Sequence, residues 1–168
     1  HLEDVFVKQS FADDFSSAAV TFDCKVSGAG TVSVVFNGQE QSAEVGEPAE
    51  YDSGVVFGKG EVAPDVEEDV QDVSFTFAVT DPALWSAEQP NLYEAEIALL
   101  REGALVERTG LKVGLRKFEL KDRQMLLNGQ RIVFKGVNRH EWSCRTGRTV
   151  SREEMLWDVK NLKAHNVN

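Results

Sequence analysis

Cysteine is scarce in this chain, and the patterns that cysteine forms in metal and redox sites are missing. The 168 residues include two cysteines, Cys24 and Cys144, and no Cys-x-x-Cys pair. Histidine and cysteine do not cluster at metal-ligand spacing, which argues against a zinc-organised fold. Cys24 lies on the apolar side of an alternating segment, which predicts a small buried hydrophobic side chain rather than a disulfide partner or a nucleophile.

The chain also has few basic residues and no long hydrophobic run. Lysine and arginine number 18 against 28 acidic residues, for a net charge of −10. Nucleic-acid binding requires a basic face, so no nucleic-acid partner is expected, and we attribute the acidity to solubility. No apolar run approaches the roughly 18 residues of a membrane span, and no signal peptide is recognisable, so no membrane partner is expected. A phosphate-binding loop, a dinucleotide fingerprint and a Ser/His/Asp order are absent as well.

From His1 to about Val113 the sequence alternates between apolar and polar residues. Four segments show the alternation clearly: 20–26, 32–36, 73–79 and 93–99. Successive side chains of a strand point to opposite faces, so each segment predicts a strand with one buried and one solvent-exposed face. Such strands are typical of antiparallel sheets.

Turn signals separate these segments. They are Ser27-Gly28-Ala29-Gly30, Asn37-Gly38, Gly58-Lys59-Gly60, Asp81-Pro82 and Glu102-Gly103. Short strands with frequent turns predict an all-β fold, an immunoglobulin-like antiparallel β-sandwich over residues 1–116. The Cys…Trp…Cys spacing of antibody domains is absent, so the likeness is architectural only.

After Gly114 the pattern changes. Asn128-Gly129, set between two apolar segments, predicts a two-residue β-hairpin because both turn positions need positive φ. The second segment continues through 132–136, which is apolar enough to predict a mostly buried strand. A helix is expected from Ser151, because Glu154 completes a capping box with it. Three apolar residues of that helix share one face: Met155, Val159 and Leu162.

This strand, the loop after it and the helix make one βα unit, which buries its apolar faces only against a parallel sheet or barrel. We therefore expect residues 117–168 to be the N-terminal part of a truncated (β/α)8 barrel, and the chain to be a piece of a longer protein. The unpaired strand and the helix face are expected to dock on the sandwich, pair with another copy or stay mobile.

Candidate chemistry lies in the long connection 137–150. Asn138, Arg139, His140 and Glu141 follow the predicted strand directly, where the active sites of (β/α)8 barrels lie. The alternative is a polar rim in which Arg139 and Glu141 pair with barrel neighbours, and the residues alone favour that alternative.

Two weaker candidates lie in the sandwich. The acidic stretch from Glu61 to Asp69 has carboxylates suited to calcium, but a solvated loop is the favoured interpretation. Trp85 has a ring that suits stacking on a sugar, and a packing role is favoured for it.

Several motifs in order give the chain a family resemblance. They are His1-Leu2-Glu3-Asp4-Val5, Phe11-Ala12-Asp13-Asp14-Phe15-Ser16, Leu84-Trp85-Ser86 with Pro90-Asn91-Leu92-Tyr93, Val113-Gly114-Leu115-Arg116, Leu126-Leu127-Asn128-Gly129 and Gly136-Val137-Asn138-Arg139-His140-Glu141. Nearly end to end, the chain resembles the bacterial lactase-type β-galactosidases of glycoside hydrolase family 2. Trp142 departs from the pattern, because many relatives carry another histidine there.

The resemblance implies a retaining hydrolase of terminal non-reducing β-D-galactosides, with two catalytic glutamates on later barrel strands beyond Asn168. The chain alone is then expected to be inactive and to hold no catalytic residue. His140 matches the family histidine that contacts the galactosyl hydroxyls in the sugar pocket. The family's magnesium and sodium ligands match no residue of this chain, so no cofactor is expected in it. The parent is expected to be cytoplasmic and a homo-oligomer, with the β-galactoside and the remaining domains of its chain as partners.

Two alternatives stay open. One is a free-standing sandwich module that binds carbohydrate or protein without hydrolysis. The other is a parent enzyme of different specificity, such as a β-glucuronidase.

Overall fold

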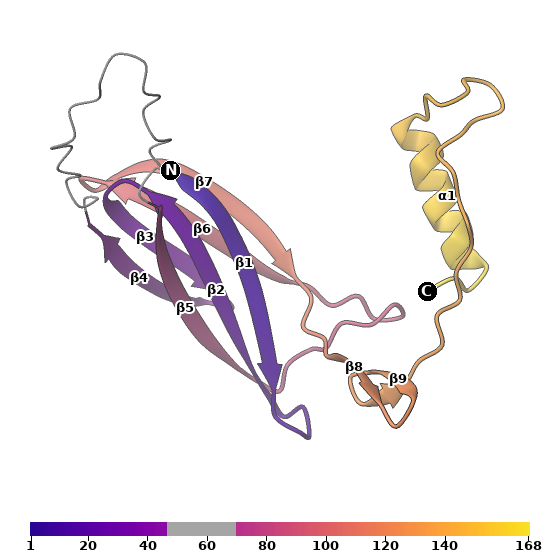
Figure 1. The fold of residues 1–168 in the computed structure, drawn as a ribbon, viewed down its shortest axis with the longest axis horizontal. Helices are drawn as coiled ribbons and strands as arrows, with labels where there is room; N and C mark the ends of the chain where they lie inside the picture. The colour runs from indigo at the N-terminus through magenta and orange to yellow at the C-terminus, as the bar shows by residue number, and fades with distance from the viewer. Residues whose placement is uncertain (47–69) are drawn as a thin grey trace, which may run out of the picture. The chain divides into compact units, whose positions relative to one another are not determined.

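The computed structural model describes residues 1–46 and 70–168, and the chain divides into two units, His1–Lys117 and Phe118–Asn168 (Figure 1). The described part of the first unit is a β-sandwich of two antiparallel sheets. One sheet has the strand order β1-β2-β5 and the other β4-β3-β6-β7. The strands are β1 (Leu2–Phe11), β2 (Ser17–Ser27), β3 (Gly30–Phe36), β4 (Gln39–Val45), β5 (Val70–Thr80), β6 (Tyr93–Arg101) and β7 (Ala104–Val113). The predicted sandwich is confirmed, and the four alternating segments lie in β2, β3, β5 and β6.

The core of the sandwich consists of the inward-facing residues of both sheets. Phe22, Phe36 and Phe77 are fully buried, and their ring centroids lie 5.3 to 5.8 Å apart. Burying each such ring stabilises the fold by roughly 1.5–3 kcal/mol. Cys24 is also fully buried and free, and burial raises the pKa of its thiol to about 11. The thiol is therefore un-ionised at neutral pH, which confirms Cys24 as a small hydrophobic residue of the core.

Two of the predicted turns, Asn37-Gly38 and Glu102-Gly103, connect neighbouring strands, whereas Gly58-Lys59-Gly60 lies outside the described residues. Asn37 and Gly38 have φ of 49° and 72° between β3 and β4, and Glu102 and Gly103 have φ of 50° and 78° between β6 and β7. Paired positive φ values fit the right-handed twist of the flanking strands, which explains why Asn-Gly and Glu-Gly occupy these positions.

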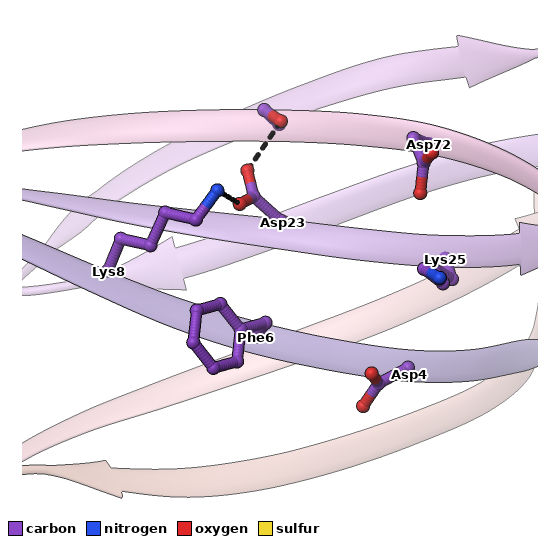
Figure 2. A pocket seen from close by; sticks show the side chains of 7 residues that line it. Asp4, Phe6, Lys8, Asp23, Lys25 and Asp72 are labelled. Carbon is purple, nitrogen blue, oxygen red and sulfur yellow. Dashed lines mark hydrogen bonds and ion pairs between the residues drawn. The ribbon is translucent and has the colours of Figure 1, made fainter.

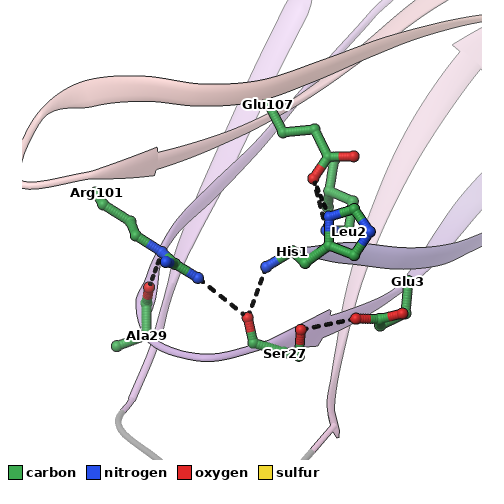
Figure 3. Close-up of polar contacts among 7 residues, drawn as sticks. All are labelled: His1, Leu2, Glu3, Ser27, Ala29, Arg101 and Glu107. Carbon is green, nitrogen blue, oxygen red and sulfur yellow. Dashed lines mark hydrogen bonds and ion pairs between the residues drawn. The ribbon is translucent and has the colours of Figure 1, made fainter.

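Side chains join the two sheets at both edges. On one side, Gln41 of β4 donates through Nε2 to the Thr76 carbonyl of β5 at 2.7 Å, and Gln39 donates to the Ala78 carbonyl at 3.1 Å. On the other side, Glu107 of β7 accepts a hydrogen bond from the Leu2 amide of β1 at 2.9 Å (Figure 3). That amide lowers the pKa of the Glu107 carboxyl below its usual value. These bonds satisfy polar groups at the edge strands, which would otherwise be open to pairing with another chain.

The second unit begins with a small three-stranded sheet of order β10-β9-β8. Its strands are β8 (Phe118–Lys121), β9 (Gln124–Leu127) and β10 (Gln130–Arg131). The hairpin at Asn128-Gly129 is confirmed, with φ of 52° and 75°. A second hairpin turns at Asp122 and Arg123, with φ of 51° and 63°.

The prediction of a buried strand over 132–136 is wrong. Strand β10 ends at Arg131, and Val133 and Phe134 are 53% and 55% exposed. A strand exists only through hydrogen bonds to a neighbouring strand, and in the described residues none runs beside 132–136. The side chain of Asn168 lies there instead, accepting from the Lys135 amide at 2.9 Å and donating to the Val133 carbonyl at 3.2 Å.

Helix α1 (Arg152–Ala164) has the predicted capping box. The Glu154 amide donates to the Ser151 hydroxyl at 3.2 Å, and the Ser151 amide donates to the Glu154 carboxylate at 3.0 Å. No residue of the helix is buried, and Met155 and Val159 of the predicted apolar face are exposed. Within the described residues, no helix combines the length and the apolar character that crossing a membrane requires.

Candidate functional site

The loop between β10 and α1 carries the residues that the sequence singled out. His140 and Glu141 are both exposed. In the part of the chain that the structure describes, neither side chain has a hydrogen-bond or ion-pair partner. Both are therefore available to a ligand or to residues outside the described part. The predicted pairing of Glu141 with a neighbour is not seen within these residues.

Arg139 is the member of the cluster that does have a partner. Its Nε and Nη2 atoms both donate to Oδ2 of Asp158 on α1, at 2.8 and 2.5 Å. Both side chains are only about one-third exposed, at 30% and 33%. The polar-rim interpretation is confirmed for Arg139, with a helix residue as its neighbour. Asp158 belongs to no motif that the sequence indicated.

Ser143 fixes the loop at a second point. Its hydroxyl donates to the Glu154 carboxylate at 2.9 Å, and its backbone exchanges two hydrogen bonds with Gly147, at 2.8 and 2.9 Å. Glu154 thus joins the loop to the helix cap. Hydrogen bonds from the Ser151 amide, which has the larger effect, and from the Ser143 hydroxyl lower the pKa of the Glu154 carboxyl. This group is therefore ionised at neutral pH.

An open hollow of about 470 Å³ lies against this loop, lined by His140, Glu141, Trp142 and Arg148. An imidazole, a carboxylate, an indole face and a guanidinium are groups that bind sugars, through hydrogen bonds to hydroxyls and through stacking on the ring. Arg148 was not singled out in the sequence. Its place in the hollow follows from the turn at Ser143–Gly147, which Arg148 directly follows.

A larger hollow, of about 580 Å³, lies on the outer face of the β1-β2-β5 sheet (Figure 2). Phe6 projects from β1 there and is 60% exposed. The carboxylate of Asp23 accepts from Lys8 at 2.5 Å and from the Ser74 hydroxyl at 2.6 Å, and these bonds lower its pKa. Because Asp23 is already bonded to its neighbours, we do not assign a site to this face.

Of the two weaker candidates from the sequence, the structure describes Trp85 but not the acidic stretch. Trp85 is half-buried, stacks under the Arg116 guanidinium at 4.5 Å, and packs so closely on Gly114 that a Cβ there would lie 2.9 Å from the indole. Its packing role is confirmed. The acidic stretch Glu61–Asp69 lies outside the described residues. Among the residues that are described, no three His, Cys, Asp or Glu side chains gather to hold a metal ion.

Two family models match the chain, and the boundary between them lies close to the boundary between the two units. The sequence model described as "Glycosyl hydrolases family 2" matches residues 1–116, and "Glycosyl hydrolases family 2, TIM barrel domain" matches residues 118–168. Together with the sandwich, these matches define the class of the chain: an all-β domain of glycosyl hydrolase family 2, followed by residues that match the TIM barrel domain of that family.

Similar proteins and solved structures carry the names of glycosidases. A β-galactosidase of Clostridium acetobutylicum is 38% identical, with 100% of this chain and 17% of the relative covered. A β-galactosidase of Streptococcus thermophilus is 57% identical over 50% of this chain and 8% of the relative. Among solved structures, a family 2 member from Bacteroides cellulosilyticus has a TM-score of 0.74 at 19% identity, covering 100% of this chain and 23% of that one. The β-glucuronidase of Parabacteroides merdae has a TM-score of 0.71 at 20% identity, covering 100% and 20%.

The chain belongs to glycosyl hydrolase family 2. It spans less than a fifth of the length of the two curated relatives described above.

Proposed function

We propose that this chain is the sandwich domain and the opening of the catalytic barrel of a β-galactosidase. The observation that carries the proposal is the difference in identity between two sets of relatives. Curated proteins named β-galactosidase are 38% and 57% identical over the segments that they share with this chain. The β-glucuronidase structure is 20% identical, a level that supports the fold alone.

The reaction proposed is hydrolysis of terminal β-D-galactosides with retention of configuration. Retention requires two carboxyl groups about 5–5.5 Å apart, one as nucleophile and one as acid/base. We place both on barrel strands beyond Asn168, so this chain alone is proposed to be inactive and its sandwich structural. We expect any magnesium or sodium ion of the enzyme to be held by residues outside this chain, because the ligands of the family match none of its residues. A cytoplasmic, homo-oligomeric parent remains part of the proposal.

His140 is the residue of this chain that we assign to substrate binding. It is exposed at the hollow that it lines with Trp142 and Arg148, and its ring has no hydrogen-bond partner among the described residues. An imidazole hydrogen bond to a sugar hydroxyl accelerates the reaction when it strengthens as the ring flattens toward the transition state.

The test compares the full-length enzyme with the chain 1–168 on chromogenic β-galactoside and β-glucuronide substrates. Full-length protein is expected to cleave the galactoside, and the chain alone to give no turnover above a blank. His140→Asn in the full-length enzyme is expected to lower kcat/KM about 10- to 100-fold, the equivalent of one lost hydrogen bond of ~1.4–2.7 kcal/mol. His165→Asn, at the C-cap of α1, is the matched control and is expected to leave the rate unchanged.

A preference for the glucuronide would overturn the assignment in favour of a β-glucuronidase. Glycan binding without hydrolysis by the full-length protein would instead support a non-catalytic sandwich module. Turnover by the chain 1–168 would contradict the placement of both catalytic carboxyls beyond Asn168.

A further inference from the structure

Helix α1 holds the candidate loop at two points through two acidic residues. Asp158 accepts both hydrogen bonds from Arg139, and Glu154 accepts the hydrogen bond from Ser143. Glu154 and Asp158 are four residues apart on a helix, so their side chains lie on one face, one turn from each other. The two contacts are therefore a consequence of one helix face meeting the loop.

The two points of attachment flank a three-residue segment. Arg139 immediately precedes His140–Trp142, here called the arch, and Ser143 immediately follows it. With both ends of the arch fixed, few backbone conformations remain to its three residues. The pair of hydrogen bonds between Ser143 and Gly147 separates the arch from the rest of the loop.

Both acidic groups are suited to this task. A guanidinium that donates twice to a carboxylate makes a charge-assisted contact with defined geometry. Glu154 uses one oxygen for Ser143 and the other for the Ser151 amide, so it joins the arch directly to the capped end of the helix. Helix α1 thereby supports a segment that has no strand beside it among the described residues.

We propose that Asp158 and Glu154 are positioning residues that fix the direction of His140 by holding the two ends of the arch. The inference rests on the proposed function, because it assumes that His140 contacts the sugar. Asp158 acts through Arg139 and Glu154 through Ser143. Neither acid touches the substrate.

The first test is a double-mutant cycle in the full-length enzyme with a chromogenic β-galactoside. Asp158→Asn is expected to lower kcat about tenfold with little change in KM, because misdirection of His140 weakens an interaction made in the transition state. In a His140→Asn background the same substitution is expected to have no further effect, since the residue through which it acts is gone. Asp158→Glu is expected to recover part of the lost rate, because it restores the carboxylate.

Glu153→Gln is the matched control, an exposed acid-to-amide change in the first turn of the same helix. It is expected to leave kcat unchanged. An equal loss of rate from Asp158→Asn with and without His140, or an equal loss from Glu153→Gln, would overturn the inference.

The second test needs no activity, and so separates this inference from the proposed function. In crystals of the full-length enzyme, the backbone of residues 140–142 is expected to have B-factors close to those of α1. Asp158→Asn is expected to raise them relative to α1, while Glu153→Gln leaves them unchanged. Unchanged relative B-factors in the Asp158 variant would contradict a positioning role even if the full-length enzyme cleaves galactosides. An inactive full-length enzyme with the expected loss of order would contradict the proposed function alone.

Discussion

The two units of this chain solve the problem of burying apolar side chains very differently. Among the described residues, every buried apolar side chain lies in the sandwich, between Ala18 and Leu115. The described residues after Lys117 include none, and large apolar side chains such as Phe134, Trp142 and Trp157 are exposed there. Both units have the alternation, turn residues or caps that their strands and helix require. They differ in whether this chain supplies the surface against which the apolar side chains pack.

The reason lies in how each kind of element is paired. An antiparallel strand pairs with its neighbour through a hairpin of a few residues, so the sandwich carries its own partners. A parallel barrel strand and its helix need strands that arrive after long crossovers. The helix α1 can form its cap locally, but its apolar face cannot be covered by local sequence.

Separation of the two units should give the largest effect. Residues 1–117 expressed alone are expected to keep the unfolding free energy of the sandwich, because its core is complete. Residues 118–168 alone are expected to lack stable structure, since they bury no apolar side chain among themselves. Amide hydrogen exchange measures both, and strong protection within the excised 118–168 peptide would break the comparison.

The two cysteines allow the difference in burial between the two units to be measured in one chain. Cys144 is exposed in the loop and Cys24 is fully buried. A thiol reagent at neutral pH is expected to modify Cys144 rapidly in the native chain and Cys24 only after unfolding, since burial also suppresses its thiolate. Mass spectrometry of labelled peptides identifies the site. Cys144→Ser should abolish native labelling, and residual rapid labelling of Cys24 in that variant would argue against a closed core.

Within the sandwich, burial should decide the effect of the same substitution at two phenylalanines. Phe22→Ala in the core is expected to cost about 3–5 kcal/mol of unfolding free energy through lost burial and a cavity. Phe6→Ala, on the exposed outer face of the same sheet, is expected to cost less than about 1 kcal/mol. Urea denaturation of the two variants measures the difference, and comparable losses would show that Phe6 has a partner surface in solution.

In the second unit, the largest local effect should come from the helix cap. Ser151→Ala removes the hydroxyl that accepts from the Glu154 amide, and is expected to destabilise α1 by about 1 kcal/mol. Ser151→Asp keeps an acceptor at the N-cap and is expected to leave the helix intact. The Cα chemical shifts of residues 152–164 measure helix population, and equal shifts in the two variants would show that the cap does not limit the helix.

The smallest predicted effect is a pH dependence of the same helix. The pKa of Glu154 is held below its ordinary value of 4.5, chiefly by the Ser151 amide. Its contribution to the helix is therefore present above about pH 4.5 and is lost as the pH falls through the lowered pKa. Glu154→Gln keeps a capping acceptor but cannot titrate, so its helix shifts should be flat over this window. Glu153→Gln should titrate like the parent chain, and a flat profile in the parent would refute the assignment.

The elements predicted correctly from sequence are those whose causes are local. Alternation at Val20–Val26 identified β2, paired turn residues identified the hairpins at Asn37 and Asn128, and Ser151 with Glu154 identified the helix start. The prediction failed over 132–136 because apolar composition does not establish that a partner strand is present. Of the site, His140 was located from its place after the predicted strand. Its role as a sugar ligand stays a prediction.

The amino-acid sequence by itself determined which faces are apolar, where the chain turns and where the helix begins, since each depends on residues within a few positions. Only the tertiary structure decided that Asp158 accepts from Arg139, that Glu154 also accepts from Ser143, and that glutamines of β4 donate to carbonyls of β5. These contacts join residues that are many positions apart. They form only once folding has brought their elements together, so no local sequence pattern predicts them.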